Sequence, residues 1–146
     1  MPQKILLAVD GSSCSLAAVR ALIEHLGHFT APPVLHVLYV HRPVPLESAT
    51  RHAEPDALSR YYREEGQAQL APAEALLDEA GYAYTPHIHA GDAADTIVRV
   101  ATELGCDLIA MGTHGHGVAA GAMLGSVCAK VIRRGRVPVF CPRQAA

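Results

Sequence analysis

The chain has 146 residues, half of them apolar, with a formal net charge of −2. This length suits one domain around one core, and no apolar run reaches the length of a membrane span. The small net charge gives no general attraction to polyanions, so neither nucleic acid nor a membrane is an expected partner.

The predicted elements alternate between strands and helices. The first half predicts a strand at residues 4–10, a helix from the turn at 11–13 to residue 26, a strand at 34–40 and an exposed, mobile connection with three prolines at 41–55. A long helix at 56–80 follows, in which Pro72 should cause a kink or a break. The second half predicts strands at 82–89, 107–111 and 137–142, and helices at 92–104 and 126–134.

This alternation predicts an α/β fold with a single-domain five-stranded parallel sheet and helices on both faces, a Rossmann-like architecture. Ligands of such sheets bind beyond the carboxyl ends of the strands, where the strand order reverses. We therefore expect a site in the loops after the first, second and fourth strands. The segment from Val137 to Pro142 should be an edge strand, which favours a homodimer formed by pairing with a second copy.

Cysteine spacing and the start of the chain bear on the compartment. The four cysteines form no C-x-x-C pair, which favours reduced, mostly buried thiols over a zinc or dithiol site. The first residues lack the features of a secretion signal. We therefore expect a cytoplasmic protein.

The most informative segment is the glycine-rich loop at residues 112–126. It holds five glycines between a predicted buried strand and a predicted helix start at Ser126. Glycine permits positive φ angles and a close approach of the backbone to a ligand, and the amides of Gly125, Ser126 and Val127 would be donors for a phosphate. The loop has no Walker lysine, and the turn after Asp10 has no G-x-G-x-x-G pattern.

With these residues the chain resembles the universal stress protein family over its full length, 1–146. Nucleotide-binding members carry G-x2-G-x9-G-[ST], which matches Gly112, Gly115, Gly125 and Ser126. Residues 5–12 are similar to the opening strand and acidic turn of that family, and residues 35–38 to its second strand. The resemblance implies an adenine nucleotide alpha hydrolase-like fold that binds ATP, AMP or ADP, with or without Mg²⁺.

The resemblance also implies a role for each matching position. Asp10 would accept hydrogen bonds from the ribose, and the Val37 backbone would contact the adenine edge. Gly115 would permit close passage of the chain. The remaining implied contacts are Ala8 and Val9 at the adenine, Met111 and Gly112 at the ribose, and Gly125, Ser126 and Val127 at the phosphates. His114 and His116, outside the four-residue motif, could contact the polyphosphate or help to hold Mg²⁺.

Structural explanations compete with several of these roles. Asp10 could merely cap a turn, and the basic residues at 130–136 are better explained by the end of a helix than by a phosphate site. The pairs His87/His89 and His114/His116 invite a metal, but structural histidines are favoured because no other ligands complete a site.

Three functions remain open from the sequence. The first is a nucleotide-dependent stress-response sensor or signalling dimer, which is a binding module rather than an enzyme. The second is a weak ATPase or autophosphorylating protein with Ser126 as acceptor, although no general base or lysine is placed for it. The third is a protein-interaction dimer without nucleotide, which the retained glycines disfavour.

Overall fold

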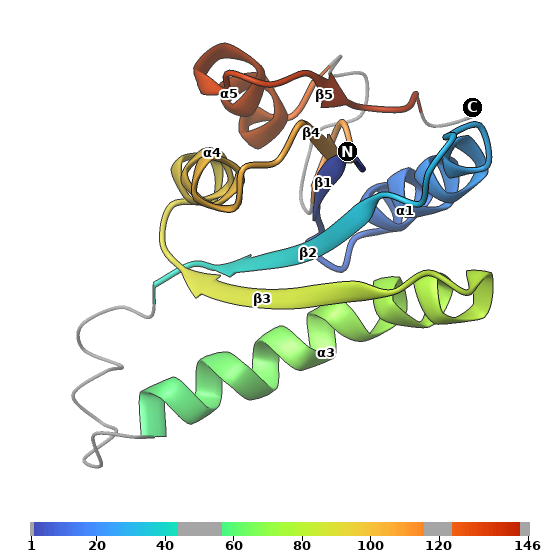
Figure 1. The fold of residues 1–146 in the computed structure, drawn as a ribbon. Helices are drawn as coiled ribbons and strands as arrows, with labels where there is room; N and C mark the ends of the chain where they lie inside the picture. Colours follow the sequence, from blue (N-terminus) through green and yellow to red (C-terminus); the bar gives the residue numbers. More distant parts are fainter. Residues whose placement is uncertain (1, 44–56, 116–123, 144–146) are drawn as a thin grey trace.

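The structure is a computed structural model that describes residues 2–43, 57–115 and 124–143. The strands are β1 (Lys4–Ala8), β2 (Val34–His41), β3 (Tyr84–Ala90), β4 (Leu108–Met111) and β5 (Val139–Phe140), and the helices are α1 (Ser13–Leu26), α3 (Ala57–Ala80), α4 (Ala93–Leu104) and α5 (Ser126–Arg134). All strands pair in parallel in the order β3-β2-β1-β4-β5. The predicted α/β fold is therefore confirmed (Figure 1). Most of the predicted connection at 41–55, and His116, lie outside the described residues.

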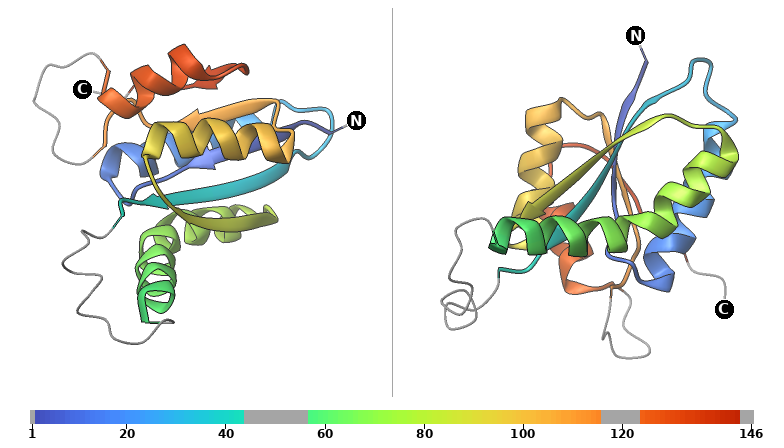
Figure 2. Two further views of the ribbon diagram at one scale, coloured as in Figure 1. Left: turned by 90° about the vertical axis from the view of Figure 1, so that its left-hand side faces the viewer. Right: turned by 90° about the horizontal axis from the view of Figure 1, so that it is seen from below.

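The sheet separates two apolar layers, because successive side chains of a strand point to opposite faces. Ile5 and Leu7 of β1 pack with α1 and α3, whereas Leu6 and Ala8 pack with α4 and α5. Figure 2 shows the sheet between these two pairs of helices. Both faces of β1 are covered, which explains its nearly continuous apolar sequence.

Two predicted element boundaries differ from the structure because of turn chemistry. The first strand ends at Ala8 rather than Asp10, since the chain turns at Gly11, whose φ is +81°. The last strand contains only Val139 and Phe140 instead of residues 137–142. Prolines on both sides of it lack the N–H that a longer ladder requires.

Helix α3 contains Pro72 but is not split. The helix runs without interruption from Ala57 to Ala80, and Figure 2 shows that it bends along its length. Pro72 lies on the exposed face, where a carbonyl that loses its intrahelical donor can bind water instead. Of the two predicted outcomes, the kink is therefore the one observed.

The strand order reverses between β1 and β4. From β1 the chain builds β2 and β3 on one side, and then crosses to β4 and β5 on the other. Ala8 is paired with Met111 at the carboxyl ends of these two strands. The predicted position of a ligand site therefore lies at the loops that follow Ala8 and Met111. Within the described parts of the chain, no helix is long and apolar enough to cross a bilayer.

Candidate functional site

The turn after β1 is held by hydrogen bonds of Asp10 and two serines. Oδ1 of Asp10 accepts a hydrogen bond from the Ser12 amide at 2.9 Å, and the Asp10 amide donates to Oγ of Ser15 at 3.2 Å. Ser12 in turn caps α1 by accepting a bond from the Ser15 amide. The capping role that competed with ribose binding is thus present, through one carboxylate oxygen.

The other carboxylate oxygen of Asp10 faces the glycine-rich loop. A Cβ atom on Gly115 would lie 2.5 Å from Oδ2 of Asp10, and a Cβ on Gly112 would lie 3.0 Å from the backbone of Cys14 and Ser15. A side chain at Gly115 would therefore have to displace the Asp10 carboxylate, and one at Gly112 would have to move the backbone of α1 by a few tenths of an ångström. Gly112 and Gly115, in the first part of the loop after β4, are therefore in close contact with the start of α1 and with Asp10, respectively.

The glycines of the motif serve close approach and not positive φ. A Cβ on Gly125 would lie 3.1 Å from the Thr113 carbonyl oxygen and 3.2 Å from Cα of His114. Gly125 has a φ of −73°, and the described glycines with positive φ are Gly11, Gly81, Gly91 and Gly105. The expectation of positive φ in this loop is therefore wrong for Gly112, Gly115 and Gly125.

The start of α5 offers two of the three predicted phosphate donors. The Gly125 amide is already engaged, because it donates to the Thr113 carbonyl at 2.6 Å. In the structure this bond closes the loop, and the phosphate contact of Gly125 stays a prediction. Ser126 is exposed and Val127 half-buried, and amides in a first helical turn have no intrahelical acceptor. An anion placed here would meet the Ser126 hydroxyl and the amides of Ser126 and Val127.

The residues predicted to contact adenine and ribose lie at two positions along the strands, some at the carboxyl ends and one, Val37, farther inside the sheet. Ala8 and Met111 are paired, buried neighbours at the strand ends, directly before the segments that carry Asp10 and the glycine-rich loop. Val9 is buried and its amide donates to the Leu38 carbonyl. Val37 is fully buried within β2, between Leu7 and Pro86, farther from the strand end than the other predicted residues.

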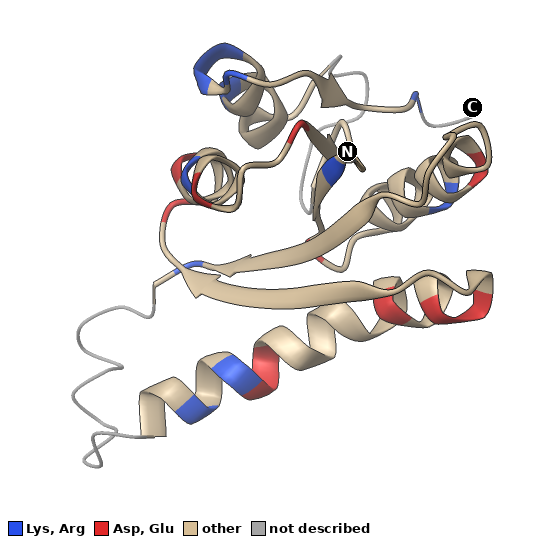
Figure 3. Cartoon of the chain, viewed as in Figure 1, with Lys and Arg blue, Asp and Glu red and all other residues tan. Residues whose placement is uncertain are grey.

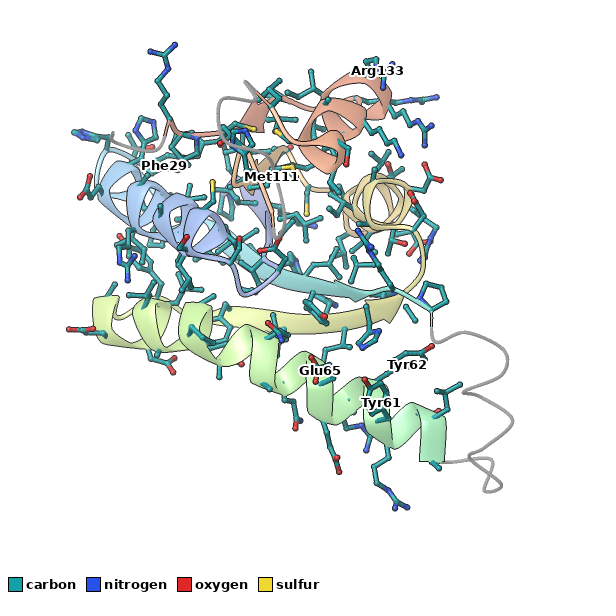
Figure 4. The ribbon with its side chains drawn as sticks, turned by 180° about the vertical axis from the view of Figure 1, so that it is seen from behind. Phe29, Tyr61, Tyr62, Glu65, Met111 and Arg133 are labelled. Atoms are coloured by element: carbon teal, nitrogen blue, oxygen red, sulfur yellow. The ribbon has the colours of Figure 1, made fainter. Side chains whose placement is uncertain are left out.

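Two side chains of this region were missed by the sequence analysis. Tyr39 extends β2 past the last residue of β1, and burial, followed by the negative charges of Glu65 and Asp10, raises the pKa of its phenol. Oε1 of Gln69 lies 2.0 Å from the position of a Cβ on Gly11, while Nε2 of Gln69 donates to Glu65. Helix α3 thus contributes polar groups to the Asp10 turn. Glu65 is labelled on this helix in Figure 4. Sequence spacing alone contains no signal for this contact.

The histidines do not form a metal site among the described residues. Nδ1 of His114 is 2.9 Å from Oγ1 of Thr113, which positions the ring at the loop. Of the pair His87 and His89, His87 meets His36 of β2 instead, with Nδ1 of His36 and Nε2 of His87 2.9 Å apart. No group of three or more metal-ligating side chains occurs in the described parts of the chain.

The charged groups of α5 lie away from its N-terminus. Figure 3 shows Lys and Arg positions on α5 and both acidic and basic positions on the neighbouring α4. Arg134 pairs with Asp95, and the Asp95 amide, followed in effect by Lys130 and Arg134, lowers the pKa of Asp92. This arrangement agrees with the interpretation of these basic residues as a helix end.

Two cavities lined by described residues lie elsewhere. One of about 530 Å³ is bounded by α3 and β3, including Arg63 and Pro86, and one of about 210 Å³ by α4, β4 and the segment before β5. Neither cavity is lined by a predicted site residue.

Comparisons with known proteins agree with this architecture. The family model described as "Universal stress protein family" matches residues 1–143. The universal stress protein MJ0531 of Methanocaldococcus jannaschii is 31% identical over 138 residues, which cover 94% of this chain and 80% of that protein. The solved structure of the hypothetical protein MJ0577 has a TM-score of 0.83 at 24% identity, covering 100% of this chain and 99% of that one. A universal stress protein solved in complex with cAMP has a TM-score of 0.70 at 26% identity and covers 98% of each chain. The chain belongs to the universal stress protein family.

Proposed function

We propose that this protein binds an adenine nucleotide, ATP, AMP or ADP, with or without Mg²⁺, between the Asp10 turn and the glycine-rich loop. One observation carries the proposal: Gly115 lies so close to the Asp10 carboxylate that a Cβ there would be 2.5 Å from Oδ2. The Asp10 carboxylate can accept hydrogen bonds from hydroxyl groups, and the first turn of α5 has amides that can bind an anion. These two groups belong to the segments that follow β1 and β4, at the strand-order reversal. A nucleotide presents these two groups as its ribose and its phosphates.

The proposed contacts follow from the positions of the groups. Asp10 would accept bonds from the ribose, Ala8 and Met111 would form the apolar floor, and Ser126 with the Val127 amide would bind the phosphates. His114 would lie beside the phosphate chain. Val37 would contact the adenine edge through its backbone, from a position between Leu7 and Pro86 in the sheet.

Similarity to a nucleotide complex supports the same ligand class. The relative solved with cAMP shares 26% of its residues with this chain over nearly its whole length. cAMP has an adenine, a ribose and one phosphate, so it tests the base and ribose contacts without a polyphosphate. We propose that the protein is a cytoplasmic binding module whose surface changes with nucleotide occupancy in a stress response.

The direct test begins with the protein as purified. Heat extraction followed by chromatography should release ATP, ADP or AMP, and calorimetric titration of the stripped protein should give a saturable heat with at least one of them. Asp10→Asn keeps the side-chain volume and should lower the affinity for every adenine nucleotide. Ser126→Ala should lower the affinity for ATP more than the affinity for AMP. If none of ATP, ADP, AMP and cAMP binds, the proposal is wrong.

The enzymatic alternative is tested in the same samples. The described loop residues include no lysine to clamp a phosphate, which favours binding over turnover. ATP that remains intact on the protein for hours supports the binding module. Phosphate release, or phosphate transferred to Ser126, would instead support a slow ATPase or autophosphorylating protein.

We also propose that the protein forms a homodimer through the segment from Val137 to Pro142. β5 lies at an edge of the sheet. The Ile109 amide donates to the Pro138 carbonyl, so the backbone groups of Val139 face away from β4. These unpaired positions on an edge strand are suited to pairing with a second copy.

A further inference from the structure

Two cysteine side chains meet between the start of α5 and the end of β5. Cys128 is the third residue of α5, and Cys141 directly follows β5. Their Sγ atoms lie 2.9 Å apart, whereas the sulfurs of a disulfide lie about 2 Å apart. An approach of about 1 Å would therefore join them. Figure 4 shows sulfur atoms, in yellow, gathered near Met111 at this end of the sheet.

We propose that Cys128 and Cys141 form a reversible intramolecular disulfide when the protein meets a low-molecular-weight disulfide oxidant such as oxidised glutathione. The two thiols differ in access: Cys128 is buried, whereas Cys141 is half-buried. In a single chain, the oxidant therefore reaches Cys141 before Cys128. Disulfides in a cytoplasmic protein are usually transient and redox-sensing, which fits a bond that forms only under oxidising conditions.

The exchange has two balanced steps. The Cys141 thiolate attacks the oxidant, whose S–S bond breaks, so that a mixed disulfide forms and one small thiolate leaves. Cys128 then loses its proton to water and attacks Sγ of Cys141, which expels the second small thiol. The protein loses two electrons and two protons, and the oxidant is reduced to two thiols.

The electrostatics of the pair favour this order of events. The hydrogen bond from Cys128 lowers the pKa of Cys141 against the opposing effect of burial, and the same bond, together with burial, raises the pKa of Cys128. A thiolate is the attacking form, so Cys141 is the first nucleophile. Once Cys141 is capped, the main cause that holds the proton on Cys128 is gone.

The other two cysteines are less well placed. Cys106 is buried at the turn between α4 and β4. Sγ of Cys14 lies 3.5 Å from Oγ1 of Thr113, against the glycine-rich loop. Because the described side chains contain no cluster of three metal ligands, Cys14, Cys128 and Cys141 do not form a metal site. The redox pair is therefore Cys128 with Cys141.

The bond would join the edge strand to the helix that begins at Ser126. Closing this short loop restricts the unfolded chain, so we expect oxidation to raise the melting temperature by about 5 to 10 °C. Formation of the bond does not require nucleotide. Cys128 lies two residues after Ser126, the proposed phosphate ligand, so we expect the bond to change the affinity for nucleotide. This second expectation rests on the proposed function.

The test equilibrates the full-length protein in buffers of reduced and oxidised glutathione, blocks the remaining thiols with N-ethylmaleimide and measures intact and peptide masses. The expected result is a loss of two hydrogens, with the peptides of Cys128 and Cys141 linked, reversed by dithiothreitol. A higher melting temperature should accompany the bond. Titration of the oxidised and reduced forms with ATP then reports the coupling separately.

Three variants keep the test decisive. Cys141→Ser, at the half-buried position, should abolish both the link and the gain in melting temperature, while Cys106→Ser should leave both unchanged. Cys128→Ala should leave only a stable glutathione adduct on Cys141. A link through Cys14, a bond between two chains, or no oxidation of Cys128 under any glutathione ratio would overturn the proposal, whatever the nucleotide titration shows.

Discussion

Oδ2 of Asp10 lies 2.5 Å from the place that a Cβ of Gly115 would occupy. The carboxylate after β1 and the loop after β4 are thus in contact at the reversal of strand order. This relationship brings two distant sequence features to one place, and a side chain at Gly115 would have to displace the Asp10 carboxylate or the backbone of Gly115.

The first prediction concerns Gly115→Ala. The added methyl group should displace the Asp10 carboxylate or the loop, and we expect the affinity for adenine nucleotides to fall at least about tenfold, which corresponds to about 1.4 kcal/mol. Isothermal titration calorimetry checks this. Gly27→Ala is the matched control, because a Cβ there would make an ordinary contact of 3.8 Å with the Glu24 carbonyl. Equal affinities of the two variants would argue against the proposed site.

The second prediction concerns the edge of the sheet. Val139→Pro removes an N–H that faces away from β4 while sparing the bond between Ile109 and Pro138. We expect it to convert the proposed dimer into monomers in analytical ultracentrifugation. Val139→Thr keeps the N–H and the branched side chain, and should remain dimeric. A dimer that survives Val139→Pro would place the interface on another surface.

The third prediction concerns the contact of α3 with β3. A Cβ on Gly66 would lie 2.6 to 2.8 Å from three carbon atoms of Ile88, so Gly66→Ala should overpack this contact. The better helix propensity of alanine offsets about 1 kcal/mol of an overpacking cost of roughly 1 to 3 kcal/mol. We therefore expect a small net loss in the free energy of unfolding, measured by urea denaturation.

A double-mutant cycle identifies the cause. Ile88→Ala removes the obstructing atoms at a cost of its own, since Ile88 packs against the core. In the Ile88→Ala background, Gly66→Ala should become neutral or stabilising, because only the helix propensity remains. If the penalty of Gly66→Ala stays the same in both backgrounds, steric contact with Ile88 is not its origin.

The fourth prediction concerns the paired rings of His36 and His87. Burial, followed by the charge of Lys4, lowers the pKa of His36 below 6.5, and burial, followed by His36 and His89, lowers the pKa of His87. Below pH 6.5 the two histidines bind protons in the unfolded chain more readily than in the folded chain. The contribution of the pair to the free energy of unfolding is therefore fully present above that pH, and it is lost as the pH falls through the lowered pKa values.

Urea denaturation at a series of pH values tests this expectation. His36→Gln should flatten the decline of the free energy of unfolding on acidification, because the remaining ring no longer faces a second one. His28→Gln, at an exposed position, is the control and should keep the decline of the parent protein. An unchanged pH profile in His36→Gln would show that the pair does not govern it.

Local sequence determined the elements of this protein. Buried strands appear as apolar runs, helix starts as Ser12 and Asp92, and helix ends as glycine, because hydrophobic periodicity and capping act within a few residues. The helix predicted at 126–134 has the observed bounds. Strand ends were less predictable where a turn or proline competed with the ladder, as after Ala8 and around β5.

The sequence by itself determined the α/β alternation, the family resemblance and the loop that carries the motif. The tertiary structure decided what the motif glycines do: they let the loop pass Asp10, the start of α1 and His114. It also brought Gln69 onto the Asp10 turn and Cys128 beside Cys141. Such contacts join residues far apart along the chain, and they depend on strand order and side-chain packing, for which local periodicity contains no signal.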